Sequence, residues 1–370
     1  MNNVLLVAPH WHPRLTFIAK HAEYIGHDLA GIVTNHDPPT LETYNCSVFD
    51  LSIPSLSLYE KIIRRFHGYP HNTCAHLIRR FDKVLKSLNP DVVLFEFATM
   101  SACFSGDCYR LGIPYVIHYH GFDIAKAYSD AHYKLQFLLN AKNAMSNIAN
   151  SLRTKERLME LGVSEDLISL KYMGVFIPKE PTPLPKVKHL QIVHLGSFSK
   201  VKNPMATIKA FEWALKKGLQ ATLTMAGDGQ LKEIAVRYIT ANNIAGIRIL
   251  PTIEHSAVTD LLKMSHLLTQ HSVLTSSAEQ ETFGVSLAEA MAYSRAVVVS
   301  DHGSFRELVT NNKTGILFPE HDWRAQGEAF LELDRNRQKL QYFGIAGYAR
   351  ARKLFSEERE SMELRKILNI

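Results

Sequence analysis

The sequence predicts an α/β protein built from two doubly wound domains, each with a parallel sheet. Three observations support this class: the length of 370 residues, short apolar runs that alternate with helical patterns, and a restart of that alternation after a proline-rich break. A chain of this length suits two domains better than one compact core. Short buried strands separated by helices favour parallel pairing through crossover helices. Ligands of such sheets bind beyond the carboxyl ends of the strands, so we expect a site in a cleft between two facing domains.

The first half of the chain shows the alternation from its start. A helical pattern over residues 15–25 follows the first apolar run, and we assign residues 1–177 to the first domain. Buried strands are predicted by short apolar runs at residues 4–7, 29–33, 92–95 and 115–117.

A proline-rich stretch separates the two halves. Residues 178–188 contain four prolines and predict an extended interdomain linker. The strand pattern then resumes and predicts a second domain over residues 189–352, with strands at 192–195, 221–225, 247–250, 267–269 and 296–299.

The composition is that of a globular protein. Hydrophobic residues make up 46% and charged residues 21% of the chain, which excludes a disordered chain, and no apolar run approaches the ~20 residues that span a bilayer. The segment Met1 to Ala8 is too short for a signal peptide and has no basic region, so we expect a cytoplasmic protein. The net charge of +6 favours an anionic partner, but no nucleic-acid-binding signature accompanies it, and we expect no nucleic acid.

The basic charge is concentrated between Lys61 and Lys86, where Asp82 is the one acidic residue. The basic side chains there are Lys61, Arg64, Arg65, Arg79, Arg80, Lys83 and Lys86. Apolar residues at near-helical spacing predict an amphipathic helix over Ala75–Leu88. Such a helix either docks by its apolar face and leaves its basic face in solvent, or contacts an anionic acceptor or an anionic membrane surface. The second alternative would place the protein peripherally on the inner face of the cytoplasmic membrane.

The most informative segment for function runs from Glu281 to Glu289. A helix is predicted to begin near Gly284, so that Glu281 precedes the helix and Glu289 lies within it. The free amides and the dipole of the helix start favour a phosphate, and the two carboxylates can accept hydrogen bonds from hydroxyls on either side of it. A nucleotide-sugar has that layout of sugar, diphosphate and ribose. Alone, two glutamates near a helix start would also fit a charge preference on a solvated face.

This segment resembles the motif of the family 4 retaining glycosyltransferases, which have two glutamates separated by seven residues. The matching residues are Glu281, Phe283, Gly284, Glu289, Ala290, Met291 and Ala292. The resemblance implies that the first glutamate contacts the donor sugar and the second the ribose, while amides between them meet the sugar and diphosphate. On this basis the donor-binding residues here are Glu281, Thr282, Phe283, Gly284, Val285 and Glu289. The chain departs from the family at Tyr293–Ala296, where relatives usually have a Gly-Pro turn.

The resemblance implies the GT-B fold, in which two Rossmann-like domains face each other across a cleft and the C-terminal helix, here residues 353–370, packs back on the first domain. The segment Gln270–Val273 is similar to exopolysaccharide and colanic-acid-type members. Further donor contacts are implied at Gly196, Ser197, Lys202, Asn203 and Gly227. Lys202 would pair with the donor diphosphate and act in catalysis. Ser197 stands where the family usually has arginine, which removes one of two expected cations. Gly227 is also explained by a tight turn.

In the first domain the best motif follows the strand at 115–117. His120, Gly121 and Asp123 match the family's His-Gly-x-Asp, which implies a catalytic position for His120 near the donor sugar, and a structural role is the alternative. The remaining candidate acceptor-binding residues are His10, Trp11, His12 and Asp123. Alternation along the strand makes roles for His118 and Tyr119 doubtful. His10 and His12 have no evident third ligand, so we expect no metal site.

We therefore expect a retaining glycosyltransferase that moves a sugar from a nucleotide-sugar to a saccharide or lipid-linked acceptor in surface polysaccharide or glycoconjugate synthesis. No cofactor or divalent metal is expected, because Lys202 and helix dipoles would stabilise the leaving diphosphate. One alternative is an epimerase or phosphorylase on the same fold. Another is a catalytically weak, glycosyltransferase-like binding subunit, which Ser197 and the loop at Trp11 would suit.

Overall fold

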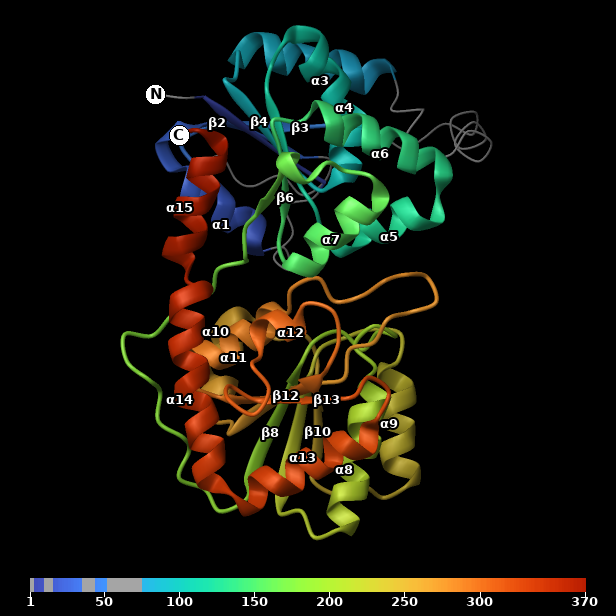
Figure 1. Cartoon of the computed structure of the whole chain (residues 1–370), viewed down its shortest axis with the longest axis vertical. Coiled ribbons are helices and arrows are strands. Elements are labelled where there is room, and N and C mark those ends of the chain that lie inside the picture. Colours follow the sequence, from blue (N-terminus) through green and yellow to red (C-terminus); the bar gives the residue numbers. More distant parts are fainter. Residues whose placement is uncertain (1–2, 10–15, 35–43, 52–74) are drawn as a thin grey trace. The chain divides into compact units, whose positions relative to one another are not determined.

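The computed structural model describes residues 3–9, 16–34, 44–51 and 75–370 (Figure 1). The chain divides into two compact units, Met1–Tyr172 with Glu360–Ile370, and Met173–Arg359. Each unit contains one parallel sheet with helices on both faces, so the predicted α/β class with two doubly wound sheets is confirmed. The chain passes from the first unit to the second after residue 172 and returns to the first after residue 359. The sequence pattern predicted these two boundaries after residues 177 and 352.

Within the described residues, the sheet of the first unit has seven strands in the order β3-β2-β1-β4-β5-β6-β7, and every neighbouring pair is parallel. In chain order the strands are β1 (Val4–Ala8), β2 (Leu29–Thr34), β3 (Ser47–Asp50), β4 (Val92–Glu96), β5 (Tyr115–His118), β6 (Ser146–Ala149) and β7 (Ile168–Leu170).

Helices cover both faces of this sheet. On one face lie α1 (Thr16–Ile25) and α15 (Glu357–Leu368), whose apolar side chains share a core with β1. The opposite face carries α3 (Ala75–Leu88), α4 (Ala98–Leu111), α5 (Gly121–Ser129), α6 (Ala131–Asn143) and α7 (Leu152–Leu161). Two short 3-10 turns, η1 (Gly26–Asp28) and η2 (Glu165–Leu167), precede β2 and β7.

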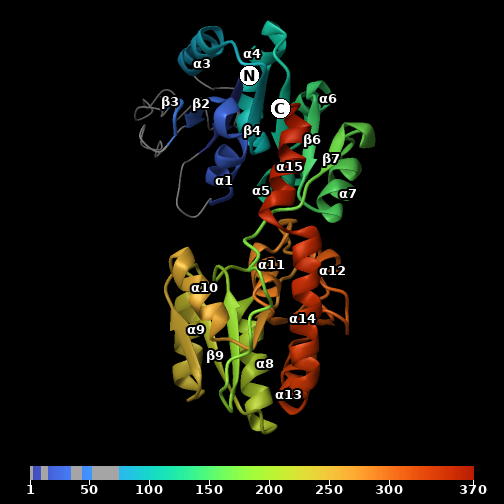
Figure 2. The same ribbon diagram turned by 90° about the vertical axis from the view of Figure 1, so that its left-hand side faces the viewer.

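Helix α15 completes the first unit from the far end of the sequence. It lies beside α1 in both views (Figures 1 and 2), and Arg365 donates to Asp28 at 2.8 Å and to the carbonyl of Tyr24 at 3.0 Å. Leu364 and Leu368 are buried in the core that contains α1. A helix more than three hundred residues away in sequence therefore closes one face of the first sheet.

The sequence pattern missed four short strands, β3, β6, β7 and β13, and β6 has a physical reason of its own. Asn147 lies in the middle of β6 and is completely buried. Its amide donates to the carbonyl of Ala141 at 3.0 Å, and its oxygen accepts from the hydroxyl of Tyr119 at 2.8 Å. Because these hydrogen bonds offset the cost of burying an amide, a central strand can lack the apolar run used to predict strands.

The second unit has a six-stranded parallel sheet in the order β10-β9-β8-β11-β12-β13. Its strands are β8 (Leu190–Leu195), β9 (Ala221–Ala226), β10 (Ile247–Leu250), β11 (Leu267–Gln270), β12 (Ala296–Ser300) and β13 (Ile316–Phe318). Its helices are α8 (Pro204–Lys216), α9 (Lys232–Ala241), α10 (His255–Lys263), α11 (Val285–Ala292), α12 (Phe305–Leu308), α13 (Trp323–Arg335) and α14 (Arg337–Leu354). Helix α8 packs with α13, and α11 packs with α14.

The segment predicted to be a linker is fastened to the second unit. Arg295 is completely buried, and its guanidinium donates to the carbonyls of Thr182 and Pro183 at 2.8 Å each. The hydroxyl of Ser294 accepts from the amide of Thr182 at 3.1 Å. The departure from the family turn at Tyr293–Ala296 therefore has a structural consequence, because its two polar side chains hold the extended chain.

Helix α3 docks as the amphipathic pattern predicts. Phe81, Val84 and Leu85 are buried in the first unit, while Arg79 and Lys83 are exposed. The first part of the basic segment, including Lys61, Arg64 and Arg65, lies outside the described residues. Within the part of the chain that the structure describes, no helix combines the length and apolar character needed to cross a bilayer.

Candidate functional site

Lys202 and Glu281 meet at the carboxyl ends of the second sheet. Lys202 comes from the loop between β8 and α8, and Glu281 from the loop between β11 and α11. The ammonium of Lys202 forms an ion pair with the carboxylate of Glu281, although the two residues are 79 positions apart in the sequence. Their side chains are 15% and 16% exposed, so the pair is partly accessible to solvent. The structure thus brings together the predicted diphosphate-binding cation and the predicted sugar-binding carboxylate.

Gln270, the last residue of β11, connects this pair to the start of α11. Its side-chain oxygen accepts a hydrogen bond from Lys202 Nζ at 3.2 Å, and its amide donates to the hydroxyl of Ser286 at 2.8 Å. Gln270 is completely buried. A buried amide between a lysine and a helix N-terminus fixes the direction of the lysine side chain relative to the first free amides of that helix.

Two glycines are required by close approaches around these loops. A Cβ at Gly227 would lie 2.1 Å from the carbonyl oxygen of Gly196, so the loops after β8 and β9 can touch only without a side chain there. Gly284 caps α11 with a φ of 92°, and a Cβ on it would lie 2.7 Å from the ring of Phe305. The glycines predicted from the motif therefore have structural reasons that hold with or without a bound nucleotide.

Glu289 lies within α11, and its side chain is 16% exposed. Burial raises the pKa of Glu289 to about 7. Its Oε1 lies 3.5 Å from Nδ1 of His255, which begins α10. A narrow hollow beside this carboxyl is lined by Phe176, His255, Val258, Thr259, Leu262, Glu289 and Tyr293. The second glutamate of the motif therefore borders a concave, mostly apolar surface.

The other predicted donor-side residues take different positions. Phe283 is buried and packs edge to face against Phe355 with ring centroids 5.5 Å apart, so its side chain anchors the loop and only its backbone could meet a ligand. Ser197 is exposed, and its hydroxyl donates to that of Ser199 at 3.0 Å. Asn203 adopts a φ of 41° at the start of α8. Thr282 is partly buried and Val285 is exposed at the first position of α11.

A larger cavity lies elsewhere in the second unit. It measures about 400 Å³ and is bordered by residues of β8, β9, β10 and the end of α10. Its polar lining includes Gln191, Thr222, Thr224 and Arg248, none of which follows a strand end. Since the predicted site residues are absent from its lining, this cavity is separate from the Lys202–Glu281 site.

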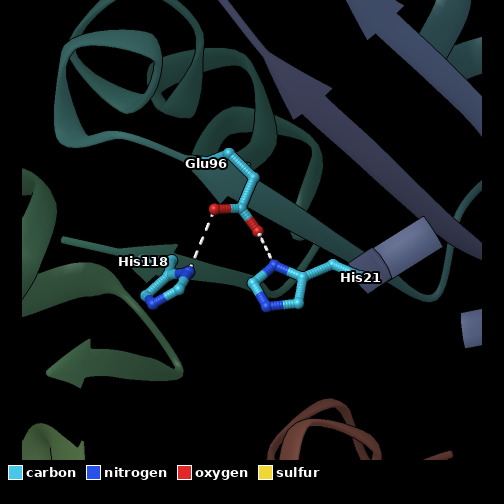
Figure 3. Close-up of side chains that lie close together, drawn as sticks. All are labelled: His21, Glu96 and His118. Carbon is cyan, nitrogen blue, oxygen red and sulfur yellow. Dashed lines mark hydrogen bonds and ion pairs between the residues drawn. The ribbon is translucent and has the colours of Figure 1, made fainter. Parts of the chain in front are cut away.

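His120 occupies the corresponding edge of the first sheet. It caps the N-terminus of α5, and its ring contacts those of Phe17 and Phe97, with centroid distances of 4.7 and 4.2 Å. Its Nε2 donates to Oε2 of Glu96 at 3.2 Å. Glu96 ends β4 and pairs in register with His118, which ends β5 (Figure 3). His120 is 12% exposed at its side chain, whereas Glu96 is completely buried.

Asp123, a candidate acceptor-binding residue, lies at the starts of two helices. It is completely buried, and its carboxylate accepts backbone hydrogen bonds from His120 at 3.1 Å and from Thr99 at 3.2 Å. These amides lie at the starts of α5 and α4, so Asp123 joins two helix N-termini. Burial raises the pKa of Asp123 to about 6, against the lowering effect of these hydrogen bonds. An acceptor could reach this carboxylate only if the loop rearranged.

The structure also identifies residues that the sequence reasoning missed. Glu96 and His118 both end strands at the edge where ligands of parallel sheets bind, and the rule applied to His120 would also have selected Glu96. His21, Lys171 and Glu360 join them, and no sequence signal indicates that three such distant residues meet. The doubtful assignment of His118 is resolved: both His118 and Tyr119 are completely buried. His10, Trp11 and His12 lie outside the described residues.

Comparisons with known proteins agree with this architecture. Residues 17–176 match the family model described as Glycosyltransferase Family 4, and residues 177–350 match the one described as Glycosyl transferases group 1. Anabaena HepE, solved in complex with UDP and glucose, has a similar fold with a TM-score of 0.80, 17% identity and 100% of each chain covered.

Two curated relatives are named for exopolysaccharide synthesis. The putative colanic acid biosynthesis glycosyltransferase WcaL of Escherichia coli is 26% identical over 58% of this chain and 55% of its own length. The amylovoran biosynthesis glycosyltransferase AmsK of Erwinia amylovora is 23% identical over 68% of this chain and 62% of its own length. The matched segments thus span little more than half of these relatives. Because the two family models together match residues 17–350, the chain belongs to the GT-B glycosyltransferases that join a Family 4 half to a group 1 half.

Proposed function

We propose that the protein is a retaining glycosyltransferase that transfers a sugar from a nucleotide-sugar to a saccharide or lipid-linked acceptor. The names of WcaL and AmsK support a role in surface polysaccharide or glycoconjugate synthesis. The complex of HepE with UDP and glucose supports a donor of the UDP-sugar type.

The meeting of Lys202 and Glu281 at the start of α11 carries this proposal. A nucleotide-sugar needs a cation and free amides for its diphosphate, and a carboxylate for the hydroxyls of its sugar. All three lie within one loop cluster, together with Gln270, which holds Lys202. In our proposal the diphosphate binds between Lys202 and the amides of α11, and Glu281 accepts from the sugar.

The chemistry proposed for this cluster is stabilisation of the leaving group. As the glycosidic bond breaks, negative charge grows on the nucleoside diphosphate, and a fixed ammonium and helix dipole lower the energy of that state. Lys202 would supply this charge, so we expect transfer to proceed without an added divalent cation. Serine at position 197 donates one hydrogen bond but no charge, which leaves more of the stabilisation to Lys202.

The test is sugar transfer from UDP-, GDP- and ADP-sugars, with released nucleoside diphosphate as the measured product, in the presence and absence of EDTA. Glu281→Ala and Lys202→Ala should each lower turnover by about 100-fold or more. Lys232→Ala is the matched control, because Lys232 also forms an ion pair near a loop of this unit, with Asp228 at 2.6 Å. Full activity in either of the first two variants would contradict the site assignment.

The same assay separates the alternatives. An epimerase would release no nucleoside diphosphate and would yield an epimerised donor, whereas a phosphorylase would depend on phosphate. A binding subunit would shift its melting temperature with the donor but would neither transfer nor hydrolyse it. Retention is tested by NMR of the anomeric configuration in the product.

We also propose that the exposed side of α3 contacts an anionic membrane surface. Arg79 and Lys83 are exposed on this docked helix, and each basic side chain near an anionic bilayer contributes about 1 kcal/mol. Co-sedimentation with vesicles containing phosphatidylglycerol should decrease in Arg79→Glu/Lys83→Glu and at high salt. Equal binding to neutral vesicles would contradict this proposal.

A further inference from the structure

The completely buried carboxylate of Glu96, at the end of β4, accepts hydrogen bonds from three histidines. Nδ1 of His21 donates to Oε1 of Glu96 at 2.6 Å, and Nδ1 of His118 donates to Oε2 at 3.0 Å (Figure 3). Nε2 of His120 donates to the same Oε2 at 3.2 Å. A carboxylate has about four lone-pair positions, so Glu96 can accept all three hydrogen bonds. Among these histidines, His120 is the one in the family motif.

Charges of both signs lie around Glu96. His21 lies between two carboxylates, because its Nε2 is 3.0 Å from Oε1 of Glu360 on α15. Lys171, which follows β7, forms an ion pair with the same Glu360, and its Nζ lies 3.2 Å from His21 Nε2. Among the residues that the structure describes, two carboxylates therefore face one ammonium and one imidazolium. Such a balanced, hydrogen-bonded set is the arrangement in which charges remain ionised in a protein interior.

The protonation states agree with this arrangement. Burial alone would raise the pKa of Glu96, but the charges and hydrogen bonds of the histidines outweigh it and hold that pKa well below its ordinary value. Burial would lower the pKa of His21, yet the neighbouring carboxylates raise it above the ordinary value. His118 differs, because burial lowers its pKa to about 3 and leaves a neutral ring that donates through Nδ1.

The backbone next to Glu96 also fixes the position of His120. Phe97 has a φ of 76°, which a residue with a large side chain rarely adopts, and its ring lies 4.2 Å from the ring of His120. The amide of Phe97 donates to the carbonyl of His118 at 3.1 Å. Strained conformations of this kind persist where the surrounding structure determines them, and they are frequent at functional sites.

A metal site is the competing explanation for these residues. The ligand atoms of His21, Glu96 and His118 lie within 4.8 Å of one another, and these residue types bind divalent metals. The ammonium of Lys171 opposes this alternative, because it lies 3.2 Å from the ring of His21 and would repel a divalent cation. The hydrogen bonds also account for the approach of these side chains without a metal.

We propose that Glu96 is a positioning residue for His120, and that His21, Lys171 and Glu360 keep its carboxylate ionised. Because Glu96 accepts from Nε2 of His120, it selects one tautomer and one ring orientation for the histidine of the His-Gly-x-Asp motif, to which the family resemblance assigns a catalytic position in the proposed sugar transfer. The inference rests on that proposed function. It extends the site through buried side chains to a helix near the end of the sequence.

The test is a double-mutant cycle between Glu96→Gln and His120→Ala, measured as kcat and donor KM for sugar transfer. Glu96→Gln keeps the size of the side chain and removes its charge. We expect it to lower kcat by about 10- to 100-fold, with donor KM changed less than about threefold. In the His120→Ala background the same change should alter kcat by less than about twofold, because Glu96 acts through His120.

Asp107→Asn is the matched control, since Asp107 is another buried carboxylate of this unit and its partner is Arg110 at 3.1 Å. It should leave kcat unchanged in both backgrounds. Urea unfolding of every variant shows whether it is folded under assay conditions. If Glu96→Gln does not fold, Glu96→Asp takes its place, because it keeps the charge and withdraws the carboxylate from His120 by one methylene group.

The outcomes separate the positioning role of Glu96, the role of His120 and the metal alternative. Additive losses in the double variant, or wild-type kcat in folded Glu96→Gln, would overturn the positioning role while leaving the proposed function intact. Wild-type activity in His120→Ala would overturn the role of His120 in the proposed function, and the inference with it. One equivalent of tightly bound zinc in the purified protein, lost in His21→Gln, would replace the hydrogen-bonded network with a metal centre.

Discussion

Each unit holds one cluster of charged side chains, and the two clusters have the same kinds of charge but different surroundings. In the second unit, Lys202 and Glu281 form one ion pair, and their side chains are 15% and 16% exposed. In the first unit, Glu96 is completely buried and is held by three histidines, with Lys171 and Glu360 beyond them. One pair can exchange partners with solvent or a ligand, whereas the buried network cannot exchange any partner without cost.

This difference indicates that the two clusters have different roles. A partly exposed ion pair contributes less to stability than a buried one, so in our proposed function a diphosphate would compete for Lys202 at small cost. Breaking a buried network leaves an unpaired charge in a medium of low dielectric constant, which is expensive. The cluster in the first unit is therefore suited to hold a ring in one position, and the ion pair in the second unit is suited to the binding and release of a charged substrate that we propose.

The largest expected effect is on stability in the buried network. Lys171→Met leaves the carboxylate of Glu360 without its ammonium and should lower the free energy of unfolding by about 3 to 5 kcal/mol. Urea unfolding followed by circular dichroism measures this change. A loss below 1 kcal/mol would remove the distinction between the two halves.

The same substitution at Lys202 should have a small effect on stability and a large effect on turnover. Lys202→Met should change the free energy of unfolding by less than about 1 kcal/mol, because the ion pair is partly exposed. Turnover should nevertheless fall by about 100- to 1000-fold if this ammonium stabilises the leaving diphosphate. Assays at saturating donor separate this loss from weaker binding. A large stability loss with retained turnover would reverse the comparison.

A third prediction concerns how the donor-side loops approach each other. Gly227→Ala places a Cβ 2.1 Å from the carbonyl oxygen of Gly196 and should lower the free energy of unfolding by about 3 kcal/mol. Donor affinity should fall as well, since the loop carrying Lys202 begins at Gly196. Gly218→Ala is the control: its φ is also positive at 93°, but no atom lies within 4 Å, and about 1 kcal/mol is expected. Equal losses would show that backbone conformation alone explains both.

The smallest effect concerns the buried carboxyl of Glu289, whose pKa is raised to about 7. An acid with a raised pKa stabilises the folded state while it is protonated, and this contribution is lost as the pH rises from about 4.5 through 7. Glu289→Gln should remove this pH dependence. The free energy of unfolding of the wild type should therefore fall by on the order of 2 kcal/mol more than that of the variant between pH 5 and pH 8. Parallel unfolding curves at both pH values would show that Glu289 does not titrate in this range.

Much of the fold was predictable because the central strands are continuous apolar runs. Residues 92–95 and 296–299 predict β4 and β12 directly, since strands buried on both faces need apolar side chains throughout. Strand β6 was not predictable, because Asn147 is compatible with its burial only through hydrogen bonds to Tyr119 and Ala141. Those partners become visible only in three dimensions.

The candidate site residues differ in the same way: those in local sequence motifs were predicted, and those defined by contacts between distant residues were not. Lys202 and Glu281 were predicted because each lies in a motif with recognisable neighbours, and the structure pairs them. Glu96 lies at the end of a predicted strand and was accessible to the same reasoning. Lys171 and Glu360 were not, because their chemistry depends on contacts across 189 positions of sequence.

The position of helix α15 affects how the protein folds during its synthesis on the ribosome. The first unit lacks Leu364, Leu368 and the Glu360 carboxylate until residues 360–370 have been made, whereas the second unit occupies the uninterrupted stretch 173–359. At roughly 5 to 20 residues per second, synthesis of that stretch takes about 10 to 40 s. Throughout that delay the nascent first unit exposes the apolar surface that α15 later covers, and Lys171 lacks the carboxylate of Glu360. The half of the chain that is translated first is therefore the half that matures last.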